Sequence, residues 1–203
     1  MGVRGGLSKL LAIALAASAM MPAAAQFSDS YNFLKAIKDA DNGKALEYLG
    51  KPGGSVINIR DGGTGETALH LVIRRHDQTW INYLLSKGAQ TEIKDRDGNT
   101  PLMTAAQLAD GDAVRALLQR GANANATNSR GETPLVLAVQ QRNYPIMRLL
   151  LASGANPDIA DTIAGKSARD YAKEDQRGGA TTLRVLADAK STGPKKEVAG
   201  PTR

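Results

Sequence analysis

The stretch Gly98-Asn-Thr-Pro-Leu-Met103 decides the fold of this 203-residue chain, because it recurs at a fixed interval. Related segments stand one interval earlier, as Gly65-Glu-Thr-Ala-Leu-His70, and one interval later, as Gly131-Glu-Thr-Pro-Leu-Val136. Gly165 continues the series, with Ser167 in the place of the threonine. A fixed period of this length indicates stacked copies of one supersecondary unit rather than one closed core.

The first helix of each unit begins just after this stretch. Asp97-Gly98 is a turn dipeptide. Thr100 suits the N-cap, where its hydroxyl accepts from free amides of the first turn. Pro101 suits the first helical position, where its missing N–H costs nothing. The pattern predicts a helix over 101–108.

The second helix follows a short turn. Asp110 or Asp112 caps a helix over 112–119, and Gly121 suits the left-handed position that ends it. The other two units have a glycine at the matching position, so they predict the same pair of helices.

These motifs resemble the ankyrin repeat. The ends of the second helices match the family as well, in Leu84-Leu-Ser-Lys-Gly-Ala-Gln90, Leu117-Leu-Gln-Arg-Gly-Ala-Asn123 and Leu150-Leu-Ala-Ser-Gly-Ala-Asn156. The resemblance implies an all-α ankyrin-repeat solenoid: helix-turn-helix repeats joined by short β-hairpin fingers. Three clear repeats, at about 62–94, 95–127 and 128–160, are flanked by degenerate caps at 29–50 and 161–189. His70 stands where the family uses a histidine to brace neighbouring turns.

Residues 1–25 read as a secretory signal peptide. Arg4 and Lys9 precede an apolar run over 10–20, and Ala23-Ala24-Ala25 offers a cleavage site before Gln26. The run is shorter than a membrane span, so no stable anchor is expected after cleavage. We expect a periplasmic protein, or a secreted one if the host has one membrane, with the repeat domain at 26–189.

The N-terminal cap reads as two short helices. Tyr31, Phe33, Leu34 and Ile37 recur at helical spacing, and a second apolar group stands at 45–49. We expect all of these side chains to pack. A glycine-rich linker at 50–64 follows, and its end, Asp61-Gly-Gly-Thr-Gly65, predicts a finger tip one residue longer than the next.

The core is predicted from the apolar face of each helix. Its expected members are Leu69, Val72, Ile81, Leu84, Leu85, Leu102, Ala105, Ala106, Val114, Leu117, Leu118, Leu135, Ala138, Val139, Ile146, Met147, Leu150 and Leu151. Trp80 is expected to pack, and His76 to be solvated at a helix–helix turn.

The C-terminal cap contains Gly165-Lys166-Ser167, which looks like the end of a phosphate-binding loop. That loop needs a glycine at position 160, which is alanine here. We therefore expect Ser167 to cap a helix over 168–173, with a last helix over 180–189. The basic segment 190–203 lacks apolar periodicity and is expected to be disordered.

Charge and chemistry exclude several function classes. The net charge is +6, but residues 1–25 carry +2 and residues 190–203 carry +3, which leaves about +1 for the body and argues against a nucleic-acid partner. The chain has no cysteine and only two histidines. Its acidic pairs, Asp95/Asp97 and Asp110/Asp112, fall at turns where aspartate bonds its own backbone. No catalytic, cofactor or metal site is predicted.

We therefore predict a monomeric, non-catalytic protein-binding module. The expected contact residues lie on the fingers and at the ends of the first helices: Arg74, Arg75, Lys94, Arg96, Asp97, Asn99, Gln107, Leu108, Ser129, Arg130, Glu132, Gln140 and Gln141, together with Glu66. The resemblance implies that ankyrin proteins usually bind partners through this face. Three alternatives stay open: a small-ligand carrier or a weak enzyme using the same groove, or an accessory to a periplasmic stress enzyme.

Overall fold

The computed structural model describes residues 23–51 and 56–191, with side chains over 29–51 and 56–188. The described residues form ten helices. Their bounds are α1 Ala23–Lys38, α2 Asn42–Gly50, α3 Ala68–Arg74, α4 Gln78–Ser86, α5 Pro101–Gln107, α6 Gly111–Gln119, α7 Pro134–Gln140, α8 Tyr144–Ala152, α9 Ala168–Glu174 and α10 Gly179–Ser191. The predicted leader segment up to residue 22 lies outside this part of the chain, and so does the tail from residue 192.

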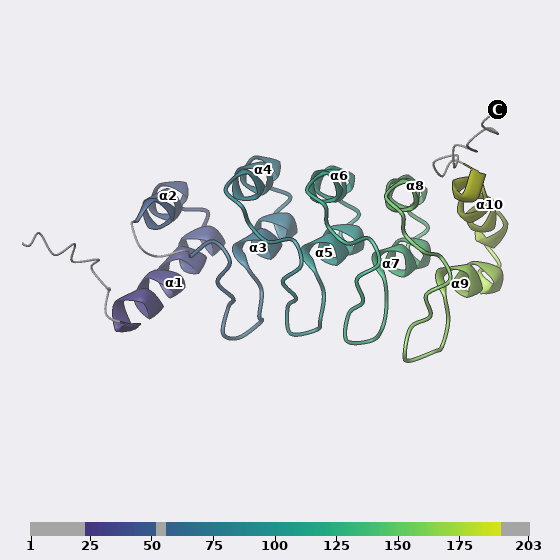
Figure 1. Cartoon of the computed structure of the whole chain (residues 1–203), viewed down its shortest axis with the longest axis horizontal. Helices are drawn as coiled ribbons and strands as arrows, with labels where there is room; N and C mark the ends of the chain where they lie inside the picture. Colours follow the sequence, from purple (N-terminus) through teal and green to yellow (C-terminus); the bar gives the residue numbers. More distant parts are fainter. Residues whose placement is uncertain (1–22, 52–55, 192–203) are drawn as a thin grey trace, which may run out of the picture.

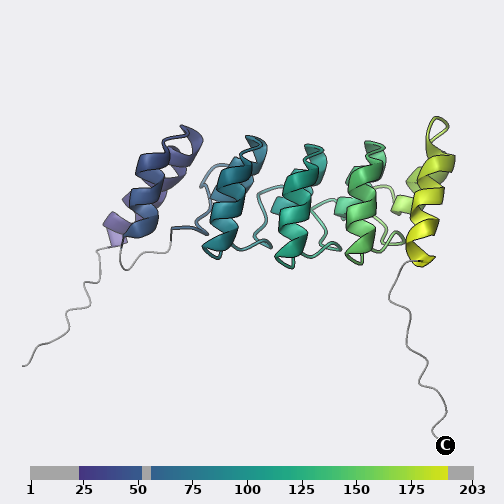
Figure 2. The ribbon, with the colours of Figure 1, turned by 90° about the horizontal axis from the view of Figure 1, so that it is seen from above.

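The helices stack in two rows (Figure 1). An inner row of α1, α3, α5, α7 and α9 lies beside an outer row of α2, α4, α6, α8 and α10, and four loops, the fingers, project past the inner row. The helices of each row follow one another in single file along the long axis (Figure 2). The all-α ankyrin-type solenoid predicted from the sequence is confirmed.

The helix starts follow the predicted capping residues. The hydroxyl of Thr100 accepts from the amide of Met103 at 3.4 Å. Asp110, not Asp112, caps α6, and its carboxylate accepts from the amide of Ala113 at 2.9 Å. The second helices α2, α4, α6 and α8 begin with a cap of this kind, from Asp41, Asp77, Asp110 and Asn143. The short turn before each of these four helices contains one residue with positive φ: Ala40, His76, Ala109 or Arg142.

The fingers are hairpin-shaped, but they carry too few ladder bonds to be strands. They span 59–67, 93–100, 126–133 and 159–167, and we number them finger 1 to finger 4. In finger 2 the amide of Asp95 donates to the carbonyl of Asn99 at 2.9 Å, and in finger 3 that of Asn128 donates to Glu132 at 3.1 Å. Within the described residues the one isolated bridge pairs Ala160 with Ser167, at the base of finger 4.

The predicted longer tip of finger 1 is confirmed, and finger 4 has the same tip. Asp61 pairs with the carbonyl five residues on, at Glu66, and Asp161 pairs likewise with Lys166. In both tips the aspartate carboxylate accepts the amides two and three residues further along, at 2.6–2.9 Å. Each aspartate therefore holds the extra residue by bonding its own turn.

The fingers are joined to one another through their backbones. The amides of Arg96, Ser129 and Thr162 donate to the carbonyls of Thr64, Asp97 and Arg130 on the preceding finger, at 2.9, 3.0 and 2.9 Å. Each accepting residue precedes a glycine with positive φ. At Gly98 an added Cβ would lie 2.5 Å from the amide nitrogen of Ser129, so only glycine lets the two fingers approach this closely.

The core lies between the two rows and matches the prediction closely. Sixteen of the eighteen predicted core residues are buried, and Leu118 and Leu151 are partly buried against them. Trp80 is buried as expected, and its indole N–H donates to Asn42 at 2.6 Å. The stack therefore has one large apolar core that includes residues of every helix pair, as expected for units that cannot bury their apolar faces alone. Met103, Ala126 and Leu137 form a second, small buried cluster.

In the N-terminal cap two side chains that were predicted to pack, one aromatic and one aliphatic, are exposed. Phe33, Leu34 and Ile37 are buried, but Tyr31 is 68% exposed and Leu46 is 46% exposed. Among the described residues, Tyr31 lines a cavity beside residues 59–62 instead of packing in the core.

The C-terminal cap forms as predicted, with a longer last helix. Ser167 and Asp170 make reciprocal capping bonds at the start of α9. Arg142 forms a two-pronged ion pair with Asp175, at 2.6 Å for both bonds, which ties the cap to the third repeat. Because α10 runs to Ser191, residues 190 and 191, which were predicted to belong to the disordered tail, are helical. The rest of the predicted tail lies outside the described residues.

Candidate protein-binding surface

His70 ties the first repeat to the second beneath the fingers. Its side chain is fully buried, and its Nδ1 accepts from the amide of Thr67 at 3.2 Å. Its Nε2 lies 3.1 Å from the carbonyl oxygen of Asn99, so it donates there, across 29 residues of sequence. These partners fix the neutral Nε2–H tautomer, and the bracing role implied by the resemblance is present.

The two histidines differ in their surroundings. Burial lowers the pKa of His70, and the Thr67 amide directed at Nδ1 leaves no room for a second proton. His76 is exposed, but it is not merely solvated as predicted, because its Nδ1 lies 2.9 Å from the carboxylate of Asp110 in the next repeat. Both side chains therefore connect neighbouring repeats.

Asn99 and Glu132 were expected at the contact surface, but the structure buries them. Asn99 is 6% exposed and Glu132 is 8% exposed. The side-chain amide of Asn128 donates to Asn99 at 3.1 Å and to Glu132 at 2.8 Å. Arg130 covers the carboxylate of Glu132 from outside at 2.7 Å, and this bond raises the pKa of Arg130. The network supports the fingers, and its buried polar groups are all paired.

The cations of the first repeat are also engaged within the molecule. Glu66, expected to be exposed, is 7% exposed, and it pairs with Arg74. Arg75 bonds the carbonyl of Ile37 and pairs with Asp77 at 2.8 Å. Arg96 bonds the carbonyl of Gly62, and Lys94 reaches the carbonyl of Thr127 at 2.6 Å. Arg75, Lys94 and Arg96, the last from the second repeat, therefore bond to a neighbouring unit, whereas Arg74 bonds within its own repeat.

Leu108, one of the predicted contact residues, is not an exposed side chain. It follows the last residue of α5 and is partly buried against the core. Gln107 is half-buried, and its carbonyl accepts from the side chain of Gln141 at 2.8 Å. The ends of the inner helices thus contribute to the contact between repeats.

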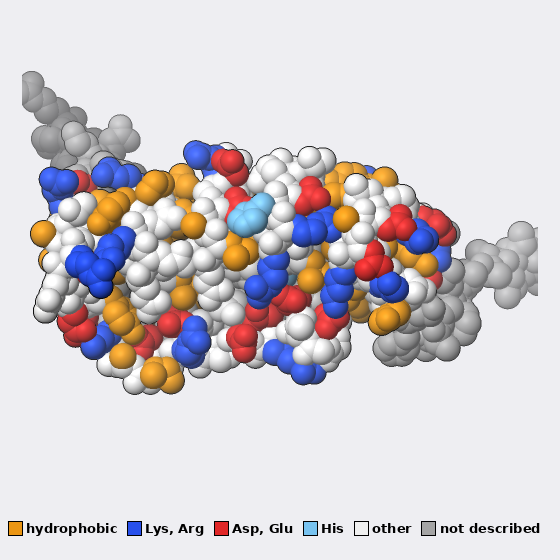
Figure 3. Space-filling view, turned by 180° about the vertical axis from the view of Figure 1, so that it is seen from behind, with side chains coloured by type: hydrophobic (Ala, Val, Ile, Leu, Met, Phe, Trp, Pro, Cys, Tyr) orange, Lys and Arg blue, Asp and Glu red, His pale blue; other side chains and the backbone are white. Residues whose placement is uncertain are grey.

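Part of the predicted surface remains accessible. The side chains of Asp97, Ser129 and Gln140 are exposed. Asp97 and Ser129 lie at the tips of fingers 2 and 3, and Gln140 ends α7. On the side opposite to Figure 1, basic and acidic side chains are intermixed, and hydrophobic ones are scattered among them (Figure 3). This face has no single sign of charge, in agreement with the small net charge of the body.

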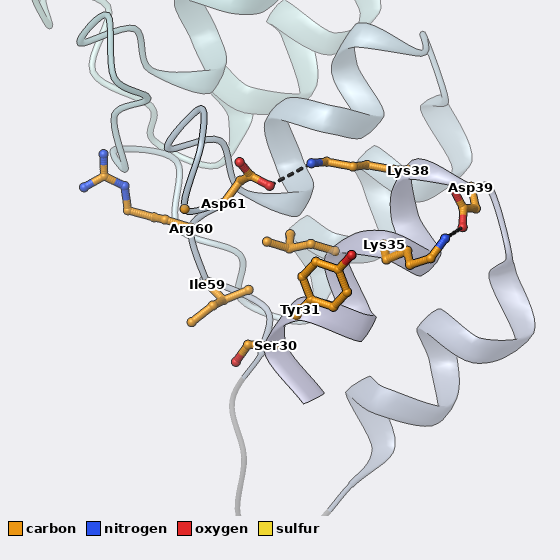
Figure 4. A pocket seen from close by; sticks show the side chains of 10 residues that line it. Ser30, Tyr31, Lys35, Lys38, Asp39, Ile59, Arg60 and Asp61 are labelled. Carbon is orange, nitrogen blue, oxygen red and sulfur yellow. Dashed lines mark hydrogen bonds and ion pairs between the residues drawn. The ribbon is translucent and has the colours of Figure 1, made fainter. Parts of the chain in front are cut away.

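A cavity of about 500 Å³ lies at the N-terminal end of the stack, between α1 and finger 1 (Figure 4). Tyr31 and Leu34 line it from α1, and Ile59 lines it from the finger. Two ion pairs lie at its rim, Lys38 with Asp61 at 2.7 Å and Lys35 with Asp39 at 2.6 Å. The bond from Lys38 also lowers the pKa of Asp61 strongly.

Sequence reasoning did not find this cavity. One sequence signal could have indicated it. A turn with a glycine precedes the inner helices α3, α5, α7 and α9, and the sequence ahead of α1 lacks it. None of the residues that line the cavity is among the predicted contact residues.

The described residues offer no group of three or more histidine, cysteine, aspartate or glutamate side chains that could hold a metal ion. The described part of the chain also has no helix that combines the length and the apolar character of a membrane span.

Comparison with known proteins agrees with this architecture. A family model described as ankyrin repeats in three copies matches residues 20–128 and 94–161. The chain is 42% identical over 52 residues to a putative ankyrin repeat protein of Fowlpox virus, which covers 26% of this chain and 15% of that protein. It is 47% identical over 47 residues to the BRCA1-associated RING domain protein 1 of Caenorhabditis elegans, covering 23% of this chain and 7% of that protein.

The chain therefore belongs to the ankyrin-repeat family, whose members generally act as protein–protein interaction modules. It spans only a small part of the length of these two relatives.

The burial of His70 predicts a pH dependence of stability. As the pH falls through about 6.5, the unfolded chain takes up a proton on His70 that the folded chain does not accept. The free energy of unfolding of the wild type should therefore fall between pH 7.5 and pH 5.5, measured by urea titration. The His70→Gln variant should lose this fall.

His76→Gln, which changes the exposed histidine, serves as the control and should keep the fall. An unchanged pH profile in His70→Gln would contradict the assignment to His70.

Proposed function

We propose that the fingers and the inner row together form a docking surface for a protein partner, without catalysis. The observation that supports this most strongly is the way in which the polar groups divide. One group of polar side chains is buried in contacts that fix the fingers: His70, Asn99 and Glu132. A second group, Asp97 and Ser129, stays exposed at the finger tips. A rigid frame that presents uncommitted side chains at a regular spacing suits the recognition of an extended protein surface.

The residues favour a protein partner over a small ligand or a substrate. Small molecules are usually held in concave, mostly apolar cavities with a few convergent polar groups. The cavity at α1 contains none of the predicted contact residues, and neither does the shallower one bordered by Leu85, Glu92 and Arg120. An accessory role beside a stress enzyme would be one form of this protein-binding function, with the enzyme as the bound partner.

A matched pair of surface variants tests the docking surface. The finger-side variant combines Asp97→Lys, Gln107→Lys and Ser129→Lys. The control combines Asp112→Lys, Thr79→Lys and Gln119→Lys, three exposed positions on the outer row with the same total change in charge. Both variants should unfold at about the wild-type urea concentration, because surface changes usually cost less than about 0.5 kcal/mol each.

The readout is the amount of each protein that co-purifies from an extract of the source cells, quantified by mass spectrometry. We expect at least one protein to be depleted about tenfold with the finger-side variant and to be retained with the control. Equal depletion with both variants, or with neither, would contradict a docking surface on the fingers.

We further propose that the protein is exported to the periplasm. The support comes from the basic, apolar and small-residue order of residues 1–25. Cleavage before Gln26 would remove the first three residues of α1 and leave Phe33 and Ile37, which bury α1 against the stack, in the mature chain.

Fractionation of the source cells tests this proposal. The mature protein should begin at Gln26 and be released by osmotic shock, as read by N-terminal sequencing. A cytosolic pool that retains Met1 would contradict export.

A further inference from the structure

Finger 1 has one backbone donor that the other fingers use and it does not. In fingers 2, 3 and 4 one backbone amide donates to a carbonyl of the preceding finger. The donors are Arg96, Ser129 and Thr162, and each directly follows the Asp or Asn that begins the turn. The equivalent residue of finger 1 is Gly62. Its amide has no acceptor among the described residues, which contain no finger ahead of finger 1.

Finger 4 shows which way this donor points. Its tip, Asp161-Thr-Ile-Ala-Gly165, has the same length and the same aspartate-bonded turn as Asp61-Gly-Gly-Thr-Gly65. In finger 4 the amide of Thr162 donates to Arg130 of finger 3 at 2.9 Å. By the same geometry the amide of Gly62 is directed toward the N-terminal end of the stack, on the side of α1.

The cavity between α1 and finger 1 lies on that side. Gly62 itself lines it, next to Ile59, and Tyr31 and Leu34 face it from α1 (Figure 4). The acidic groups at its rim, Asp39 and Asp61, are already paired with lysines. Arg60 also lines the cavity, and its Nε donates to the carbonyl of Gly65 at 3.2 Å. An apolar side chain beside Tyr31, Leu34 and Ile59 therefore buries no unpaired carboxylate.

We propose that this edge binds an extended peptide segment of a partner protein, in the place where a preceding finger would lie. A backbone carbonyl of the segment accepts from the amide of Gly62, and an apolar side chain beside that carbonyl enters the cavity over Tyr31, Leu34 and Ile59. Addition of an extended segment to an unpaired edge is a recurring mode of peptide recognition. The proposal rests on the proposed function as a protein-binding module, but it concerns a different surface.

The structure itself limits the occupant. A second copy of this chain cannot continue the stack here, because its α9 and α10 would need the space that α1 and α2 already fill. The occupant must therefore be a segment without helices of its own at this point. In each of the three contacts between fingers, the preceding finger supplies one backbone carbonyl that accepts from one amide of the next finger. The segment would supply the same carbonyl to the amide of Gly62.

Gly62 allows a matched pair of variants. It is exposed, its φ is not positive, and an added Cβ would meet nothing within 4 Å. Gly62→Ala should therefore keep the fold and the N–H. Gly62→Pro removes the N–H, and proline suits the second position of a turn. The two variants differ mainly in the donor that the proposal requires.

The probe is a short blocked peptide of alternating Ser and Thr with one central Leu, titrated into protein made from the full chain and followed in amide NMR spectra. We expect the signals of Gly62, Ile59 and Tyr31 to move, while those of the finger tips at Asp97 and Ser129 stay in place. Gly62→Ala should bind like the wild type, and Gly62→Pro should bind about tenfold more weakly. A central Ala in the peptide should weaken binding by a similar factor.

Three results would overturn the proposal. One is equal binding by Gly62→Pro and Gly62→Ala, and another is equal binding of the Leu and Ala peptides. The third is a Gly62 signal that moves with protein concentration in the absence of peptide, which would assign the edge to a second copy. If the peptide does not bind but the finger-side variant still loses its partner, the peptide site fails and the docking surface on the fingers stands.

Discussion

The backbone hydrogen bonds between fingers hold the stack in register. The amides of Arg96, Ser129 and Thr162 each reach the carbonyl of the finger before. An amide and a carbonyl meet at this distance only if no side chain lies between them, and Gly98 keeps that space open. The position of each finger, and of the side chains at its tip, depends on the finger before it. At the end of the series an added Cβ on Gly165 would meet nothing within 4 Å, because no finger follows it in the described part of the chain.

A buried polar layer beneath the fingers supports this contact. His70 bonds Asn99, and Asn128 bonds both Asn99 and Glu132. A buried polar group without a partner is costly, so these bonds favour one arrangement of the fingers over others. Rigidity of this kind matters for binding, because a preorganised surface loses less conformational freedom when a partner docks. The residues that make the surface rigid are thus different from those left to contact a partner.

Most of the fold could be predicted from the sequence, since capping residues, turn glycines and apolar periodicity all repeat in phase. The contact surface could be predicted only in part. Asn99 and Glu132 look like exposed finger-tip residues in the sequence, but both bond Asn128 in the structure. For Asn99 this partner belongs to the next unit, and for Glu132 it lies on the other side of the same turn. Leu108 looks exposed by its place at a helix end, but it packs partly buried against the core. Such contacts arise between units, and the pattern within one unit does not specify them.

The dependence of the stack on the close approach of the fingers can be measured directly at Gly98. Gly98→Ala and Gly121→Ala introduce the same side chain at residues with φ of +81° and +80° in the same repeat, so the backbone strain is matched. The added Cβ meets the amide of Ser129 in the first case and nothing within 4 Å in the second. We predict that urea unfolding of Gly98→Ala shows a loss of stability that exceeds the loss in Gly121→Ala by about 1 kcal/mol or more. Equal losses in the two variants would contradict the account.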